Sequence, residues 1–203
     1  MINTLKAGGL LIIPIIVCGI FATYIIIERF IYFKNIKRRD DQLKKDLRIA
    51  LDSANLSACE SACTDAGTPT AQVVKKALDS RRFDDQALRE ITEAEMECVI
   101  PEMEHWLTPL GTIANIATLL GLLGTVTGNM KAFGVLGAGG TMGDPALLAG
   151  AIGEALVTTV AGLCVSIPSL IFHNYFVSRV NRRIADMQAV VTEVLLKIKG
   201  RIK

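Results

Sequence analysis

The chain has 203 residues, 51% of them hydrophobic, and a formal net charge of +2. This composition, together with a positive mean hydropathy, excludes a soluble domain of average composition. So small a net charge gives no reason to expect a nucleic-acid partner, and its meaning depends on where the charged residues lie. The apolar residues are concentrated in a few parts of the chain.

Three long runs are almost free of charged side chains. Residues 7–27 and 107–130 contain none, and residues 145–178 contain only Glu154. Each run reaches the roughly 20 residues that a helix needs to cross about 30 Å of hydrocarbon. The pattern therefore predicts an all-α membrane protein with three transmembrane helices. The first run is longer than the apolar core of a signal peptide and no small-x-small cleavage site precedes Glu28, so we expect it to be retained as an anchor.

Basic residues flank the predicted spans unequally. They are numerous after the first and third spans, whereas the N-terminus offers Lys6 and the loop between the second and third spans offers Lys131. Because basic residues stay on the cytoplasmic side, the N-terminus and that loop are predicted to be periplasmic. The segment 28–105 and the tail are predicted to be cytoplasmic. The basic residues behind this prediction are Arg29, Lys34, Lys37, Arg38, Arg39, Lys44 and Lys45, then Arg179, Arg182, Arg183, Lys197, Lys199, Arg201 and Lys203.

The predicted topology gives the chain long helical cytoplasmic extensions. After the first span we expect helices over 40–56, 71–80 and 84–106, with a polar break at 64–70. The last of these helices is expected to run into the second span with Pro101 as a kink, and the tail to continue the third helix. The regions are 1–33 (periplasmic N-terminus and first span), 34–105 (cytoplasmic helices), 106–130 (second span), 131–145 (short periplasmic loop), 146–176 (third span) and 177–203 (cytoplasmic helical tail).

Side chains that could carry enzyme or metal chemistry are few. Cys59 and Cys63 are four residues apart, on one helical face, but no further ligands accompany them, so a zinc site is not expected. His105 and His173 stand alone near the predicted inner boundary of the membrane. The sequence contains no catalytic triad, nucleotide-binding loop or metal cluster. We therefore expect neither an enzyme nor a bound cofactor or metal.

Polar residues recur along one face of the second span. Positions 111, 115, 118, 122, 125 and 129 follow steps of four and three, which keeps them on one side of a helix. Small residues beside this stripe allow two helix backbones to approach closely. The polar members of the stripe are Asn115, Thr118, Thr125 and Asn129, and the small residues beside it are Gly121, Gly124 and Gly128.

The third span carries a similar stripe of small and hydroxylated residues. Its members are Ile152, Ala155, Thr159, Gly162 and Ser166, with Glu154 and Thr158 on a neighbouring face. One interpretation is that such residues only cement helix packing, with hydroxyls bonded to their own backbone, and for Thr158 we adopt it. For the two stripes together we favour a shared polar pathway.

Glu154 is the one carboxylate in this apolar stretch. Helical spacing places Thr125 and Glu154 level with each other, roughly 8–12 Å inside the outer boundary, and Thr159 nearer the middle. The spans supply no basic residue to pair with Glu154, so we expect it to be protonatable near neutral pH, because a low dielectric disfavours the charged form. The alternative is a permanently protonated Glu154 that only donates a hydrogen bond between helices.

Three stretches resemble a known family. LLGLLGTVTG at 119–128, GEALVTTVAGLCVSIPSL at 153–170 and IIIERF at 25–30 are similar to the ExbB/TolQ/MotA proton-channel family, and most to its ExbB branch. The resemblance covers the first span and residues from about Glu93 to Met187, while the segment 40–92 adds nothing specific to it. Thr118 and Asn129 depart from the usual pattern of the family, in which a proline stands at the first of these positions.

The resemblance implies a mechanism and partners. Members of the family form a ring in the bacterial inner membrane, thought to be a homopentamer, around single-span helices of an ExbD-type protein with a membrane aspartate. Protons load that aspartate, and the work passes to a TonB-like energy transducer that drives outer-membrane transport. By motif position, the resemblance assigns the proton pathway to Thr125, Thr159 and Glu154.

Three other interpretations remain open at this stage. The chain could be a TolQ-like subunit of the Tol-Pal system, or a homologue driven by sodium instead of protons. From a different class, it could be a structural membrane scaffold whose polar stripes only pack against a partner helix.

Overall fold

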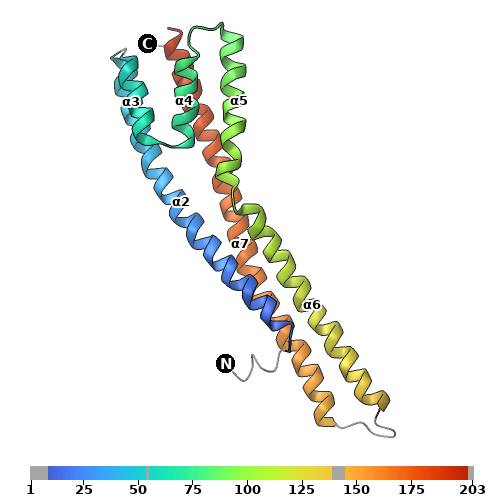
Figure 1. Ribbon diagram of the computed structural model, residues 1–203. Coiled ribbons are helices and arrows are strands. Elements are labelled where there is room, and N and C mark those ends of the chain that lie inside the picture. Colours follow the sequence, from blue (N-terminus) through green and yellow to red (C-terminus); the bar gives the residue numbers. More distant parts are fainter. Residues whose placement is uncertain (1–8, 54, 139–144, 201–203) are drawn as a thin grey trace. The chain divides into compact units, whose positions relative to one another are not determined.

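The computed structural model describes residues 9–53, 55–138 and 145–200, and the described chain is all-helical. It contains α2 (Ile12–Asp52), α3 (Leu56–Ala66), α4 (Pro69–Asp79), α5 (Asp85–Glu104), α6 (Leu107–Ala138) and α7 (Pro145–Ile198) (Figure 1). Helices α2, α6 and α7 are long and apolar enough to cross a membrane. The predicted all-α fold with three membrane-spanning helices is confirmed.

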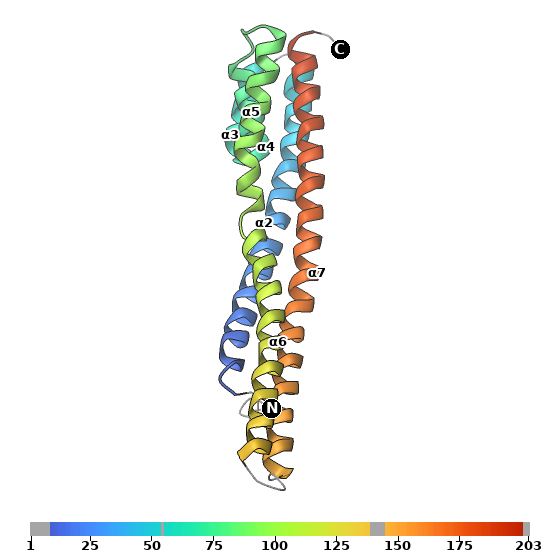
Figure 2. The ribbon, with the colours of Figure 1, turned by 90° about the vertical axis from the view of Figure 1, so that its right-hand side faces the viewer.

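The chain divides into two compact units, and α2 and α7 each contribute to both. The first, which we call the apolar unit, consists of Met1–Glu28 and Trp106–Tyr175. The second, the charged unit, consists of Arg29–His105 and Phe176–Lys203. The expected continuation of the third span into the tail is confirmed, because α7 is one unbroken helix in both views (Figure 1 and Figure 2).

The apolar unit is held together by contacts at small residues. A Cβ atom built at Gly162 would lie 2.5 Å from the carbonyl oxygen of Ala117, so the backbones of α6 and α7 touch at this point. Helix α2 joins them, since a Cβ atom at Gly19 would lie 3.2 Å from the Val165 side chain. Close backbone approach through small residues is the usual way in which helices associate in lipid.

The charged unit has a core of large apolar side chains. Val73, Val74 and Leu78 of α4 are fully buried, as is Phe176 of α7. Phe176 stacks on Phe33 of α2 with their ring centroids 5.7 Å apart. The stack joins α2 to α7 within this unit.

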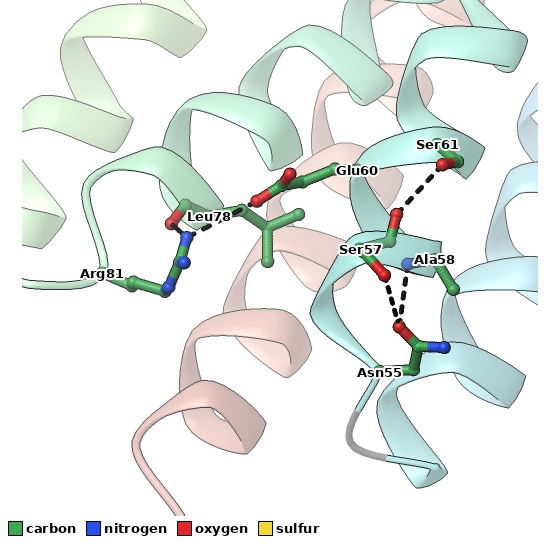
Figure 3. Close-up of polar contacts among 7 residues, drawn as sticks. All are labelled: Asn55, Ser57, Ala58, Glu60, Ser61, Leu78 and Arg81. Atoms are coloured by element: carbon green, nitrogen blue, oxygen red, sulfur yellow. Dashed lines mark hydrogen bonds and ion pairs between the residues drawn. The ribbon is translucent and has the colours of Figure 1, made fainter.

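The prediction of a helix over 40–56 is wrong about where that helix ends. Helix α2 ends at Asp52, and Asn55 starts α3 by accepting a hydrogen bond from the amide of Ala58 (3.1 Å) and another from the Ser57 hydroxyl (2.8 Å) (Figure 3). Gly67 ends α3 in a left-handed conformation (φ 54°) that glycine adopts at little cost. The predicted break at 64–70 is therefore narrower, and a second break precedes it.

Capping also fixes the starts of the next two helices. Thr68 accepts from the amide of Ala71 (3.2 Å) at the start of α4, and Asp84 accepts from Ala87 (3.3 Å) at the start of α5. Each cap satisfies one of the amides that a helix start leaves open. An ion pair of 3.5 Å between Arg81 and Glu60 fastens the end of α4 to α3 (Figure 3).

The expectation that the helix over 84–106 runs into the second span is wrong. Helix α5 ends at Glu104 and α6 begins at Leu107, while Pro101 lies inside α5. The break is at Trp106, whose φ of 70° does not fit a right-handed helix. The guanidinium of Arg29 donates to the carbonyl of Met103 (3.4 Å), one of the acceptors that the end of α5 leaves open.

Helix α6 continues beyond the predicted end of the second span. It reaches Ala138, so the first part of the expected loop at 131–145 is helical, and residues 139–144 lie outside the described chain. The first proline after Met130 is Pro145, and Ala132 is buried, so the helix can continue despite Gly134 and Gly137. The added helical turns bring Lys131 onto the same helix as the polar stripe.

Candidate proton pathway

The polar stripe of α6 lies mainly on a face that the single chain leaves open. Asn115 and Asn129 are exposed, and Thr125 is half-buried with its hydroxyl donating to the carbonyl of Leu122 (2.6 Å). Polar groups on a helix of this hydropathy are costly against lipid. The stripe therefore favours contact with water or with another chain.

Two hydroxyl groups of α7 bond directly to α6. Thr159 donates to the carbonyl of Gly121 (2.9 Å), and the hydroxyls of Thr118 and Ser166 are 2.7 Å apart. Thr159 also bonds the carbonyl of Ala155 (3.1 Å). The structure thus places Thr159 and Ser166 along the seam between the two helices, with Ser166 buried.

The four glycines of the stripes lie at this same seam. Added Cβ atoms at Gly124 and Gly128 would come within 2.5 Å of Thr158 and 2.4 Å of Ala155, respectively. Gly121 and Gly162 face each other, since a Cβ atom at Gly162 would lie 3.0 Å from the Cα atom of Gly121. Any larger residue at these positions would push the two backbones apart.

Thr158 behaves as expected. Its side chain is buried against Gly124, and its hydroxyl donates to the carbonyl of Glu154 (2.8 Å) on its own helix. The packing interpretation adopted for Thr158 is confirmed.

The register of α6 against α7 corrects the predicted depths. Gly124 faces Thr158 and Gly128 faces Ala155, so Thr125 lies level with Thr158 and not with Glu154. Glu154 lies about one helical turn further toward the α6–α7 connection. The prediction was wrong because it counted depth from Met130, whereas α6 runs on to Ala138.

Glu154 has a cationic partner, and the expectation that it lacks one is wrong. The Nζ atom of Lys131 lies 2.6 Å from Oε1 of Glu154. The sequence predicts a loop at Lys131, whereas the structure places it in the extended α6, with its side chain reaching α7. The signal that could have revealed this partner was the position of Lys131 directly after the apolar run.

A second polar cluster lies in the charged unit and was not foreseen from the sequence. The Asp40 carboxylate is buried, accepts a hydrogen bond from Thr70 (3.2 Å) and lies 3.5 Å from the Arg183 guanidinium. Burial raises the pKa of Asp40, although Thr68 and Arg183 act in the opposite direction. The cluster ties α4 to α2 and α7.

The described residues contain no group of three or more His, Cys, Asp or Glu side chains arranged to hold a metal ion. Cys59 and Cys63 are buried thiols, and burial raises the pKa of Cys63 to about 12. His105 is exposed, and His173 packs over Gly111. The two cysteines and His173 therefore pack between helices, and His105 lies on the surface.

Comparison with known proteins gives a match over the part of the chain that forms the α6–α7 seam. The MotA/TolQ/ExbB proton channel family matches residues 65–189, which include α6, most of α7 and the seam between them. The chain belongs to this family. Its members are transport components and not enzymes, and the chain is accordingly a multi-pass membrane protein and a subunit of a proton channel. The match also takes in residues 65–92, a part of the chain that carried no recognisable motif.

Curated relatives extend the match over most of the chain. An ExbB-like biopolymer transport protein (ExbB-like 3) of Synechocystis sp. is 31% identical over 191 residues, covering 94% of this chain and 91% of the relative. The biopolymer transport protein ExbB of Neisseria gonorrhoeae is 25% identical over 188 residues, covering 86% and 84%. ExbB of Xanthomonas campestris pv. campestris is 34% identical over 134 residues, covering 66% and 49%.

Proposed function

We propose that the chain is an ExbB-type motor subunit that couples the proton gradient to outer-membrane transport. It would work with an ExbD-type single-span protein that carries a membrane aspartate, and with a TonB-like energy transducer. The observation that carries the proposal is the exposed polar stripe of α6, with Thr125 level with the seam at which Thr159 meets Gly121. The relatives named ExbB are described as biopolymer transport proteins, in line with this role.

The same stripe supports assembly into an oligomer. A polar face on an apolar helix has to be covered by protein or water, and a homo-oligomeric ring around a partner helix would cover it on every subunit. We propose a pentameric ring in the bacterial inner membrane. The distribution of basic residues supports a periplasmic N-terminus and a cytoplasmic C-terminus.

The proposed proton pathway begins at Glu154, nearest the α6–α7 connection. It passes Thr125 and Thr159 and reaches the aspartate of the partner. An assumed membrane potential of ~150 mV supplies about 3.5 kcal/mol per proton, which is enough to bias one conformational step. The pathway would be lined on either side by polar side chains that can bind water, those of Asn115, Thr118, Asn129 and Ser166.

Reconstitution with the partner tests the proposal. Proton flux into vesicles and partner-dependent uptake in cells are measured for Glu154→Gln and Thr159→Val. We expect both variants to lose most of the flux while still assembling. Thr192→Val is the matched control, because Thr192 is an exposed threonine of α7 in the charged unit. Flux at the wild-type level in both pathway variants would overturn the proposed roles.

The same assay separates the alternatives. A structural scaffold would show no ion flux even with the partner present, and its assembly would depend on Glu154. A sodium-driven homologue would lose flux in sodium-free buffer. A TolQ-like subunit would conduct protons but would support the Tol-Pal system in place of TonB-dependent uptake in complementation.

A further inference from the structure

The carboxylate of Glu154 lies close to two elements besides its own helix. On one side Lys131 of α6 places its ammonium group 2.6 Å from Oε1. On the other side lies Gly9, just before α2, where an added Cβ atom would come 1.9 Å from the same oxygen. Gly9 has a φ of +62°, a conformation that suits glycine. A side chain at position 9 would therefore clash with the carboxylate.

Among the described residues, one charged side chain, that of Lys131, forms an ion pair with Glu154. Gly9 contributes no charge, and the α7 neighbours that lie one turn away, Gly150, Thr158 and Val157, carry none. Lys6 and Asp144 lie outside the described residues. Lys131 is therefore the described cation that compensates the carboxylate.

Both side chains of the pair are partly exposed in the single chain. The Lys131 side chain is 57% exposed and the Glu154 side chain 26% exposed. A partly exposed ion pair is not fixed by packing, and two flexible side chains must be ordered to keep it closed. A proton arriving at the carboxylate from the outer side can therefore displace the ammonium group.

We propose that Lys131 is a positioning residue for proton entry, which holds Glu154 charged at the outer end of the α6–α7 seam until a proton displaces its ammonium group. The inference rests on the proposed function. The incoming proton bonds to the Glu154 carboxylate and neutralises it, while Lys131 keeps its own proton. When that proton moves inward to the partner's carboxylate, Glu154 becomes charged again and returns to Lys131.

Removing the ammonium takes away the counter-charge that the described residues give Glu154. A carboxylate without a counter-charge is costly in a membrane-embedded helix, so we expect the carboxyl group of the variant to keep its proton. It would then hold its proton and release it poorly. We expect Lys131→Met to reduce proton flux several-fold and Lys131→Arg, which keeps the positive charge, to retain it.

Carbodiimide labelling tests the pair without the partner. Dicyclohexylcarbodiimide reacts with protonated carboxyl groups in apolar surroundings, and its adduct on the Glu154 peptide is quantified by mass spectrometry in membranes at neutral pH. We expect several-fold more adduct in Lys131→Met than in the wild type, and a wild-type level in Lys131→Arg. Lys75→Met is the matched control, since Lys75 is an exposed lysine of the charged unit.

The outcomes separate this inference from the proposed function. Equal labelling of Glu154 in the wild type and in Lys131→Met, or wild-type flux in Lys131→Met, would overturn the role of Lys131. Flux that survives Glu154→Gln would instead overturn the proposed pathway, whatever the labelling shows. Loss of flux in both Lys131→Met and Lys131→Arg, with unchanged labelling, would indicate a purely structural role and also contradict the inference.

Discussion

The apolar unit and the charged unit hold their helices together by opposite means. In the apolar unit, α6 and α7 meet where side chains are absent, at Gly121, Gly124, Gly128 and Gly162. In the charged unit, the helices meet through large buried side chains such as Leu78 and Phe176. Lipid tails give no hydrophobic drive for one helix to leave them for another, whereas water does. The same chain therefore uses close backbone contact in one unit and apolar burial in the other.

This contrast predicts opposite responses to changes in side-chain size. Residues of the charged unit should suffer when they are made smaller, and residues of the apolar seam should suffer when they are made larger. The contrast fails if truncation in the charged unit and enlargement at the apolar seam are both tolerated.

The largest effect is expected from truncating the core of the charged unit. Leu78→Ala removes a fully buried side chain of α4 and should destabilise the unit by about 2–5 kcal/mol, through lost burial and the cavity left behind. Chemical denaturation of the detergent-solubilised protein, followed by circular dichroism, measures the change. Phe83→Ala is the control because Phe83 is exposed, and an equal loss in both variants would contradict the packing described.

A smaller effect is expected from adding one methyl group at the apolar seam. Gly162→Ala places a Cβ atom 2.5 Å from the Ala117 carbonyl oxygen, so α6 and α7 have to move apart. Overpacking of this kind costs about 1–3 kcal/mol, which thermal denaturation in detergent would detect. Gly153→Ala on the same helix meets no atom within 4 Å and should be neutral or stabilising. Equal tolerance of both substitutions would argue against the close approach.

The smallest effect concerns thiol chemistry within the charged unit. Burial raises the pKa of Cys63 from the usual 9.0 to about 12, so the reactive thiolate is scarce in the folded chain. In single-cysteine variants at pH 8, maleimide should modify the exposed Cys98 quickly and Cys63 only on unfolding. Comparable rates for the two thiols would contradict the burial of Cys63.

The pH dependence of that thiol has a definite sign. The folded chain favours the neutral thiol of Cys63, so this contribution to stability is complete below the unfolded pKa of 9.0. It is lost as the pH rises from 9 toward 12, because the unfolded chain releases the proton first. A Cys63→Ala variant should lack this part of the alkaline loss of stability.

The sequence by itself determined the membrane-spanning helices and the family. Long uncharged runs can satisfy their backbone hydrogen bonds in lipid only as helices, so α2, α6 and α7 followed from composition and length. The stretches at 25–30, 119–128 and 153–170 resembled the proton-channel family, and the match over residues 65–189 shows that the chain belongs to it. Local signals such as Asn55 and Gly67 were present as well, but their part in ending and starting helices became clear only in the fold.

Only the tertiary structure decided how residues distant in sequence meet. Lys131 and Glu154 are 23 positions apart, and Asp40 and Arg183 are 143 apart, so neither pair is fixed by local spacing. Both depend on the register between two helices, which is set where small residues such as Gly128 allow contact and by how far α6 extends. A shift of one helical turn moves a side chain by about 5 Å, more than the reach of an ion pair. For this reason the sequence revealed Glu154 as an unusual carboxylate, and the fold revealed its partner.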